Sequence, residues 1–94
     1  MKSILIAVAV TLSLAMAGAA NAQEALAKSA GCMNCHDVNT KKVGPSFKDI
    51  ATKYKGNADA EAKIVGALTS GKGHPAVKAN ADDVKSLVKW VLSQ

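Results

Sequence analysis

The stretch Cys32-Met33-Asn34-Cys35-His36 places two thiols three residues apart and an imidazole directly after the second thiol. On a helical turn, side chains three residues apart lie on the same face, so both thiols can reach the edge of one flat group. The imidazole is then directed at the centre of that group from one side. A chain of 94 residues buries little apolar surface by itself, so whatever these five residues hold is expected to complete the core.

This spacing is the attachment pattern of c-type haem. In this interpretation Cys32 and Cys35 form thioethers with two vinyl groups on one porphyrin edge, and His36 binds the iron. Covalent attachment also raises the effective concentration of the haem, so a small chain can hold it with few other contacts. The motif therefore predicts one covalently attached haem c.

Three other interpretations stay open from the residues alone. A structural zinc site could use Cys32, Cys35, His36 and His74, although adjacent Cys35 and His36 are awkward as two ligands of one tetrahedral ion. A dithiol oxidoreductase also carries Cys-x-x-Cys, but after a β-strand, and no strand pattern precedes Cys32. A disulfide between the two cysteines would close a very short loop and add little stability.

The N-terminal segment 1–22 has the three parts of a secretory signal. Its start is positively charged, an apolar stretch runs over residues 4–20, and the small residues of Ala20-Asn21-Ala22 form a cleavage site. A retained membrane anchor is the alternative, but the second half of the stretch is mostly Ala and Gly. We expect cleavage after Ala22, which leaves residues 23–94 as one small domain in the bacterial periplasm.

Charge argues against a nucleic-acid partner. Without Lys2 the chain has 11 lysines and 7 acidic residues, a formal net charge of +4, and it has no arginine. Nucleic-acid binders use arginine for bidentate contacts and aromatic side chains for stacking, and this chain has three aromatic residues. The lysines instead form a solvated surface that can steer an acidic protein partner. Those in the loops expected near the cofactor are Lys41, Lys42, Lys72 and Lys78.

Four short helical patterns, without any period-two strand pattern, predict an all-α domain. The expected helices cover residues 24–30, the stretch from Pro45 at the first helical position to Gly56, the stretch from Asn57 as N-cap to Ser70-Gly71, and the stretch from Asn80 as N-cap to the C-terminus. The last is the clearest, because its apolar residues form one continuous stripe: Val84, Leu87, Val88, Val91 and Leu92.

Together, the segments 30–36, 43–50 and 87–92 resemble the short bacterial class I cytochromes c, and the similarity covers nearly all of residues 25–94. The resemblance implies a cytochrome c fold, with about four short helices wrapped around one covalently bound haem in a single domain, residues 23–94. It also implies a non-enzymatic one-electron carrier of the periplasm, in a respiratory or related chain. Such a carrier acts on redox partner proteins, and we expect a monomer without membrane attachment once the signal is removed.

The resemblance assigns roles to two further residues. The carbonyl of Pro45 is expected to accept a hydrogen bond from the His36 imidazole, which would fix the tautomer and orientation of that ring. Trp90 is an ordinary core aromatic on composition alone. In the family, an aromatic residue at this place lies where the first and last helices cross, close to the haem.

The sequence departs from the family at the sixth iron ligand. The family normally supplies a methionine followed by proline, whereas Met33 lies inside the haem motif and cannot reach the opposite face. Counted back from Trp90, the family's Met-Pro falls on His74-Pro75, which makes His74 the leading candidate. Ligation by Lys78 is weaker, because the amine must first lose its proton. An open iron site is the remaining alternative, and would indicate a protein that binds a diatomic gas.

Overall fold

The computed structural model describes residues 20–94, so residues 1–19 of the expected secretory signal lie outside the described part. The described chain has α-helices over residues 20–29, Phe47–Lys53 (α2), Ala60–Ser70 (α3) and Ala81–Leu92 (α4), and a 3-10 turn, η1, over Cys32–Asn34. These residues contain no β-strand, which confirms the all-α prediction. None of the helices described is both long and apolar enough to cross a bilayer.

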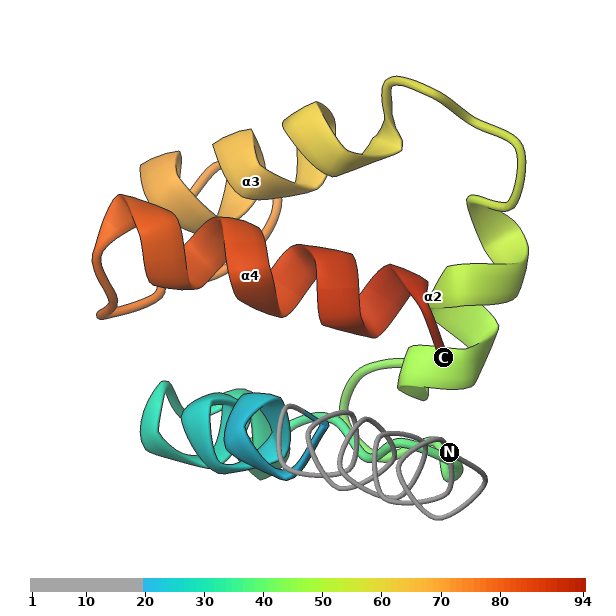
Figure 1. Ribbon diagram of the computed structural model, residues 1–94, viewed down its shortest axis with the longest axis horizontal. Helices are drawn as coiled ribbons and strands as arrows, with labels where there is room; N and C mark the ends of the chain where they lie inside the picture. The colour runs from blue at the N-terminus through green and yellow to red at the C-terminus, as the bar shows by residue number, and fades with distance from the viewer. Residues whose placement is uncertain (1–19) are drawn as a thin grey trace, which may run out of the picture.

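Helix α4 lies at the centre of the arrangement, packed against α3 and α2, with the N-terminal helix along its other side (Figure 1). The predicted cap at Asn80 is confirmed, because Asn80 Oδ1 accepts a hydrogen bond from Asp83 N at 2.9 Å. Three residues of the predicted apolar stripe, Val84, Leu87 and Val88, are each 2 % exposed. The stripe therefore forms the centre of the core.

The start of α2 differs from the prediction. Ser46 is the N-cap, its buried hydroxyl oxygen accepting a hydrogen bond from Asp49 N at 3.1 Å. Because this bond satisfies a helix N–H that would otherwise lack a partner, the helix begins at Phe47. Pro45 consequently precedes the cap, and its expected place at the first helical position is wrong. The helix also ends before Gly56, at Lys53.

Helix α3 confirms one predicted boundary and corrects the other. It ends at Ser70, with Gly71 in the left-handed conformation (φ 78°) that glycine adopts without steric cost. Asn57, however, is not the N-cap. Its side-chain oxygen accepts a hydrogen bond from Asp59 N at 3.0 Å, and the resulting turn delays the start of the helix to Ala60.

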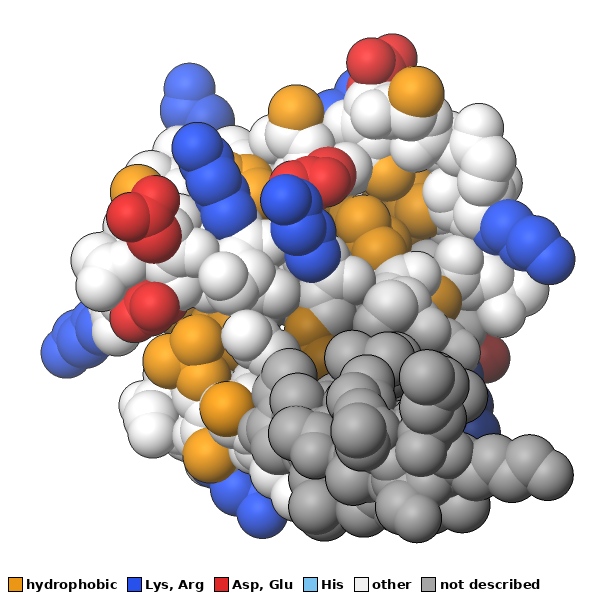
Figure 2. All heavy atoms as spheres, viewed as in Figure 1, with side chains coloured by type: hydrophobic (Ala, Val, Ile, Leu, Met, Phe, Trp, Pro, Cys, Tyr) orange, Lys and Arg blue, Asp and Glu red, His pale blue; other side chains and the backbone are white. Residues whose placement is uncertain are grey.

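The protein core is small for a domain of this length. Among the described residues its fully buried apolar side chains are Ala27, Phe47, Ala60, Val84, Leu87 and Val88. A core of this size agrees with the expectation that a cofactor supplies part of the interior. On the outside, lysine and acidic side chains alternate over the face formed by α3 and α4 (Figure 2).

Candidate functional site

The turn η1 sets the spacing of the Cys-x-x-Cys-His motif. Cys35 N and His36 N both donate to the carbonyl of Cys32, at 3.2 and 3.0 Å, so the two thiols lie one turn apart and are not joined in a disulfide. Burial raises the pKa of the Cys32 thiol. A dithiol oxidoreductase needs the opposite, a nucleophilic thiol of lowered pKa, so the structure gives that interpretation no support.

The loop of residues 37–45 folds back onto this motif and is fastened to it at two points. Gly44 N donates to the carbonyl of Cys35 at 2.7 Å. The Lys42 ammonium donates to the carbonyl of Met33 at 2.8 Å. The loop therefore stabilises the backbone of the turn that carries the two cysteines. The part that Lys42 plays in this could not be inferred from its position in the sequence.

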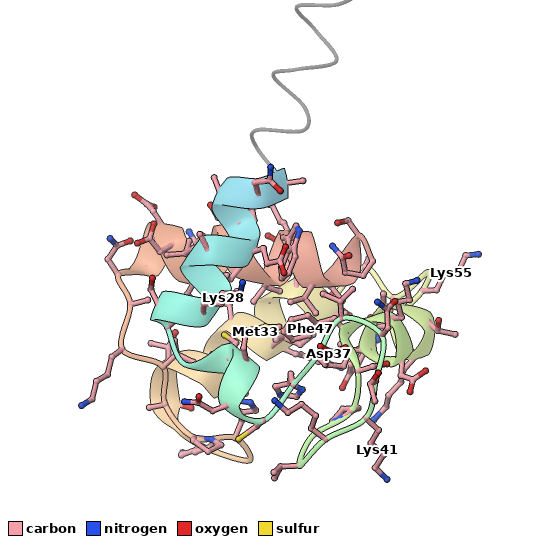
Figure 3. The ribbon with its side chains drawn as sticks, turned by 90° about the horizontal axis from the view of Figure 1, so that it is seen from below. Lys28, Met33, Asp37, Lys41, Phe47 and Lys55 are labelled. Atoms are coloured by element: carbon pink, nitrogen blue, oxygen red, sulfur yellow. The ribbon has the colours of Figure 1, made fainter. Side chains whose placement is uncertain are left out.

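Asp37 organises the start of the same loop. Its carboxylate accepts hydrogen bonds from Asn39 N and Thr40 N, at 2.9 and 3.0 Å, and these two bonds hold the pKa of Asp37 below its ordinary value. Its carbonyl accepts a hydrogen bond from Phe47 N at 2.9 Å, which links the loop to α2. Figure 3 shows the Phe47 side chain inside the molecule, whereas Lys41 extends away from it.

One hydrogen bond fixes the tautomer of His36. Its Nδ1 lies 2.6 Å from the carbonyl oxygen of Pro45, and because a carbonyl can only accept, Nδ1 carries the hydrogen. In the neutral ring, Nε2 then keeps its lone pair and is free to bind a metal. This is the contact that the resemblance implies for Pro45.

Two further residues clamp the His36 ring, and the sequence analysis missed both. Phe47 stacks on it, with ring centroids 5.4 Å apart and an interplanar angle of 27°. Gly44 approaches so closely that a Cβ at this position would lie 2.9 Å from His36 Nδ1 and closer still to Cε1. The sequence contains no signal for these contacts with His36. Gly44 has the pattern of a residue before a helix-opening proline, and Phe47 has the pattern of an apolar helix face.

His74 comes from the loop between α3 and α4, and the fold brings it to His36. The two imidazole rings are parallel within 6°, with centroids 6.1 Å apart. His74 Nδ1 donates to the carbonyl oxygen of Pro75 at 2.8 Å. Both histidines thus have Nδ1 bonded to a proline carbonyl and Nε2 available as a ligand atom.

The separation of the two rings fits a single metal ion between them. A first-row metal binds imidazole nitrogen at about 2.0–2.1 Å, and each nitrogen lies roughly 1.1 Å from its ring centre, so two ligands in line have centroids about 6.3 Å apart. The observed 6.1 Å agrees with this value. Residues 20–94 contain no group of three His, Cys, Asp or Glu side chains placed to hold a metal ion, so the four-ligand zinc site is not assembled. A porphyrin would supply four nitrogens itself, so His36 and His74 are the two further donors that would hold a haem iron here.

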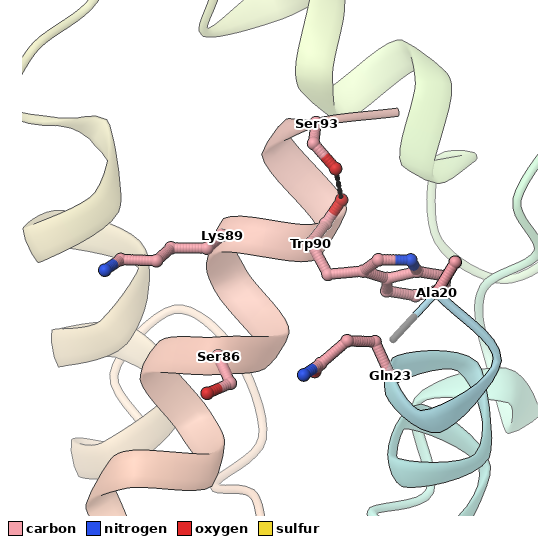
Figure 4. A pocket seen from close by; sticks show the side chains of 6 residues that line it. All are labelled: Ala20, Gln23, Ser86, Lys89, Trp90 and Ser93. Atoms are coloured by element: carbon pink, nitrogen blue, oxygen red, sulfur yellow. Dashed lines mark hydrogen bonds between the residues drawn. The ribbon is translucent and has the colours of Figure 1, made fainter. Parts of the chain in front are cut away.

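Trp90 packs against Phe47, the residue whose ring stacks on His36. Its ring meets Phe47 edge-on, with centroids 5.5 Å apart at 73°. It also lines a surface pocket between α4 and the N-terminal helix (Figure 4). The predicted place at the helix crossing therefore agrees with the structure, while its contact with haem stays a prediction. Lys78, the weaker ligand candidate, is exposed.

Comparisons with known proteins agree on one family. The family model described as Cytochrome c matches residues 19–94. Cytochrome c-551 of Pseudomonas aeruginosa is 41% identical over 88 residues, which cover 86% of this chain and 85% of that protein. Cytochrome c-552 of Hydrogenobacter thermophilus is 41% identical over 85 residues, covering 83% and 87%.

Solved structures give the same result. The class 1 cytochrome MtoD of Sideroxydans lithotrophicus ES-1 is similar to this chain with a TM-score of 0.72 and 40% identity, over 78% of this chain and 92% of that one. Cytochrome c552 of Nitrosomonas europaea is similar with a TM-score of 0.66 and 38% identity, over 74% and 96%.

Proposed function

Because this chain belongs to the cytochrome c family and is a small class I electron carrier with one covalently attached haem c, we propose that His36 and His74 are its two axial iron ligands. When bound, the haem supplies a one-electron Fe(III)/Fe(II) couple. Like its relatives, the protein transfers electrons and is not an enzyme. Cys32 and Cys35 fit the attachment motif.

The observation that carries the ligand assignment is the His36–His74 pair. Parallel rings 6.1 Å apart, each with Nδ1 bonded to a proline carbonyl, have a spacing and a tautomer that are compatible with one iron between them. In this proposal Pro45 orients His36 from behind, and hydrogen bonding to a carbonyl makes the imidazole a stronger ligand. Pro75 does the same for His74.

Replacing the family's methionine with histidine has a consequence for the potential. Thioether sulfur is a soft ligand that favours Fe(II), whereas a second imidazole stabilises Fe(III) comparatively better. We therefore expect this carrier to work at a lower midpoint potential than relatives with a methionine ligand. A redox titration in which its midpoint equals theirs would contradict this.

Electron paramagnetic resonance on the ferric protein tests the ligand pair directly. We expect a low-spin signal of the bis-imidazole type in the parent, conversion to high spin in His74→Ala, and a raised midpoint potential in His74→Met. Lys72→Ala, in the same loop, is the matched control and should retain the parent signal. A high-spin parent that His74→Ala leaves unchanged would show an open iron site, and a gas-binding function would replace the proposed one.

The partner surface is the second part of the proposal. Lys41 and Lys42 lie in the loop that carries Pro45, Lys72 and Lys78 lie in the loop that carries His74, and all four are exposed. Positive charge on both sides of the ligand pair suits a redox partner with an acidic docking surface.

The effect of these lysines on the rate of electron transfer can be measured with small charged redox reagents. Reduction by an anionic iron complex should slow as salt is added, since the Debye length falls to about 10 Å at 0.1 M, and reduction by a cationic cobalt complex should accelerate. A charge-neutralised Lys41→Gln/Lys72→Gln protein, which leaves the Lys42 contact with the cysteine turn intact, should lose most of this dependence. Lys55→Gln/Lys63→Gln, with the same net charge, should keep it. Equal salt dependence in the two variants would exclude a localised docking surface.

We also propose that the chain is exported and cleaved after Ala22, and that residues 23–94 act in the periplasm as a monomer in a respiratory or related chain. The supporting observations are the three-part signal pattern in the sequence and the membership of a bacterial cytochrome family. Cell fractionation with N-terminal sequencing tests the location and the cleavage site together. Recovery of a cytoplasmic or membrane-bound full-length haem protein would refute it.

A further inference from the structure

Lys42 is bonded to the site through both its side chain and its backbone. Its ammonium donates to the carbonyl of Met33 at 2.8 Å, and Met33 lies between the two cysteines of the haem motif. Its backbone N–H donates to the carbonyl of Gly44 at 3.1 Å. A charged donor forms a stronger hydrogen bond to a carbonyl than a neutral one does. One residue therefore connects the cysteine turn to Gly44.

Gly44 in turn is the residue whose backbone lies against the His36 ring. A Cβ there would lie 2.9 Å from His36 Nδ1 and closer still to Cε1. The next residue, Pro45, accepts the hydrogen bond from Nδ1. Gly44 is itself held on both sides, since its N–H donates to the carbonyl of Cys35 at 2.7 Å and its carbonyl accepts from Lys42 N. A displacement of Gly44 would therefore change both contacts that orient the ring.

We propose that Lys42 is a positioning residue of the iron site. Its two bonds hold Gly44 in place, and the orientation of the His36 ring depends on that placement. Lys42 acts on the ring through Gly44, and its ammonium is bonded to the backbone of its own chain, so this role is distinct from attraction of a redox partner. The inference rests on the proposed ligation of iron by His36.

Lys41 provides the comparison, because it is the preceding residue of the same loop. Both lysines are exposed, and neutralising either one changes the net charge by the same amount. Figure 3 shows the Lys41 side chain extending away from the molecule, whereas the Lys42 ammonium is bonded to the cysteine turn. A difference between variants of the two lysines therefore reports the bond and not the charge.

Two measurements on the haem-loaded protein test this role: hydrogen exchange by nuclear magnetic resonance in the reduced state, and paramagnetic resonance in the oxidised state. Lys42→Met keeps an unbranched stem but has no donor. In this variant the Gly44 N–H and the His36 Nδ1–H should exchange with solvent about twofold to tenfold faster, and the paramagnetic spectrum should shift. Lys42→Arg, which keeps a charged donor, should restore slow exchange and the parent spectrum. Lys41→Met should match the parent in both measurements.

Two outcomes would overturn the positioning role. The first is a Lys42→Met protein that unfolds more easily but keeps the exchange rates and the spectrum of the parent, which would leave Lys42 a stabilising surface residue. The second is an equal change in Lys42→Met and Lys41→Met, because loss of charge would then explain both. Failure of the ligation is seen separately, in the parent alone: His36 ring protons without the large shifts that a haem imposes on an axial ligand would refute it.

Discussion

Replacing Gly44 with alanine tests the clamp on the His36 ring. The added Cβ would lie 2.9 Å from His36 Nδ1, while nonbonded carbon contacts have an ordinary separation of about 3.5–4.0 Å. The ring must therefore retreat by at least roughly 0.6–1.1 Å, and Cε1, which would lie closer than Nδ1, must move further. A retreat of this size takes the 2.6 Å bond to Pro45 to the limit of hydrogen-bond length or beyond it.

The free energy of unfolding should fall for these reasons. Overpacking of this kind costs about 1–3 kcal/mol, and loss of the hydrogen bond adds about 0.5–1.5 kcal/mol. Reduced freedom of the unfolded chain returns about 0.4–1 kcal/mol. Gly44 does not have a positive φ, so alanine meets no backbone strain there. We expect a net destabilisation of about 0.5–4 kcal/mol.

Gly66 provides the matched control, because the same substitution should there have the opposite sign. It lies inside α3, a Cβ would meet no atom within 4 Å, and its φ is also not positive. Gly66→Ala should therefore stabilise the protein by about 0.5–1 kcal/mol. Urea unfolding of the haem-loaded proteins, followed by far-ultraviolet circular dichroism, measures both. If Gly44→Ala were as stable as Gly66→Ala, with an unchanged paramagnetic resonance spectrum, the clamp would not exist.

Three other variants probe separate features of the chain. Asn80→Ala removes the cap of α4 and should cost about 0.5–2 kcal/mol in urea unfolding; Asn57→Ala, which alters only a turn, should cost less, and the reverse order would contradict the cap assignment. Phe47→Leu keeps an apolar side chain but removes the ring contacts with His36 and Trp90, so the resonance spectrum should shift and stability should fall by about 1–3 kcal/mol. Cys32→Ala/Cys35→Ala protein purified without haem should show no cooperative thermal transition, and a sharp calorimetric peak would show that the protein core suffices.

Features encoded in neighbouring residues could be predicted from the sequence. The haem motif is a contiguous pattern, and the family comparisons confirm the cofactor that it indicates. Helix α4 combines an N-cap, acids in its first turn and a regular stripe, and all three are found. Gly71 ends α3 because a left-handed residue is cheapest as glycine. Each of these signals acts within one or two helical turns.

The incorrect boundaries come from local competition between good candidates. Pro45 suits a first helical position, but the Ser46 hydroxyl directly after it is a better cap and takes the helix start. Asn57 can cap a helix, but it closes a turn with Asp59 instead. Helix propensities of competing start residues differ by only a few tenths of a kcal/mol, so small differences in local geometry decide where the helix begins.

The clamp on His36 could not be predicted, because it depends on where the loop of residues 37–45 folds back. In the sequence, a glycine that is needed for close approach cannot be distinguished from one that is needed for a turn. At Gly44 only the structure shows which applies, because a Cβ there would lie 2.9 Å from His36 Nδ1. Phe47 belongs to the apolar face of α2 and also stacks on His36. The second contact joins residues of two different segments, and no periodicity in the sequence reports it.

The two histidines differ in how they are tied to the chain, and this difference makes one of them exchangeable. The partner of His36 is nine residues away, at Pro45, so that ring depends on the closure of a whole loop. The partner of His74 is the next residue, Pro75, and the loop around it joins α3 through Val77 N and the carbonyl of Leu68 at 2.9 Å. The support of His74 thus comes from its own loop and from the end of α3. In the proposed ligation, this loop could be replaced to change the potential of the carrier without rebuilding the loop that supports His36.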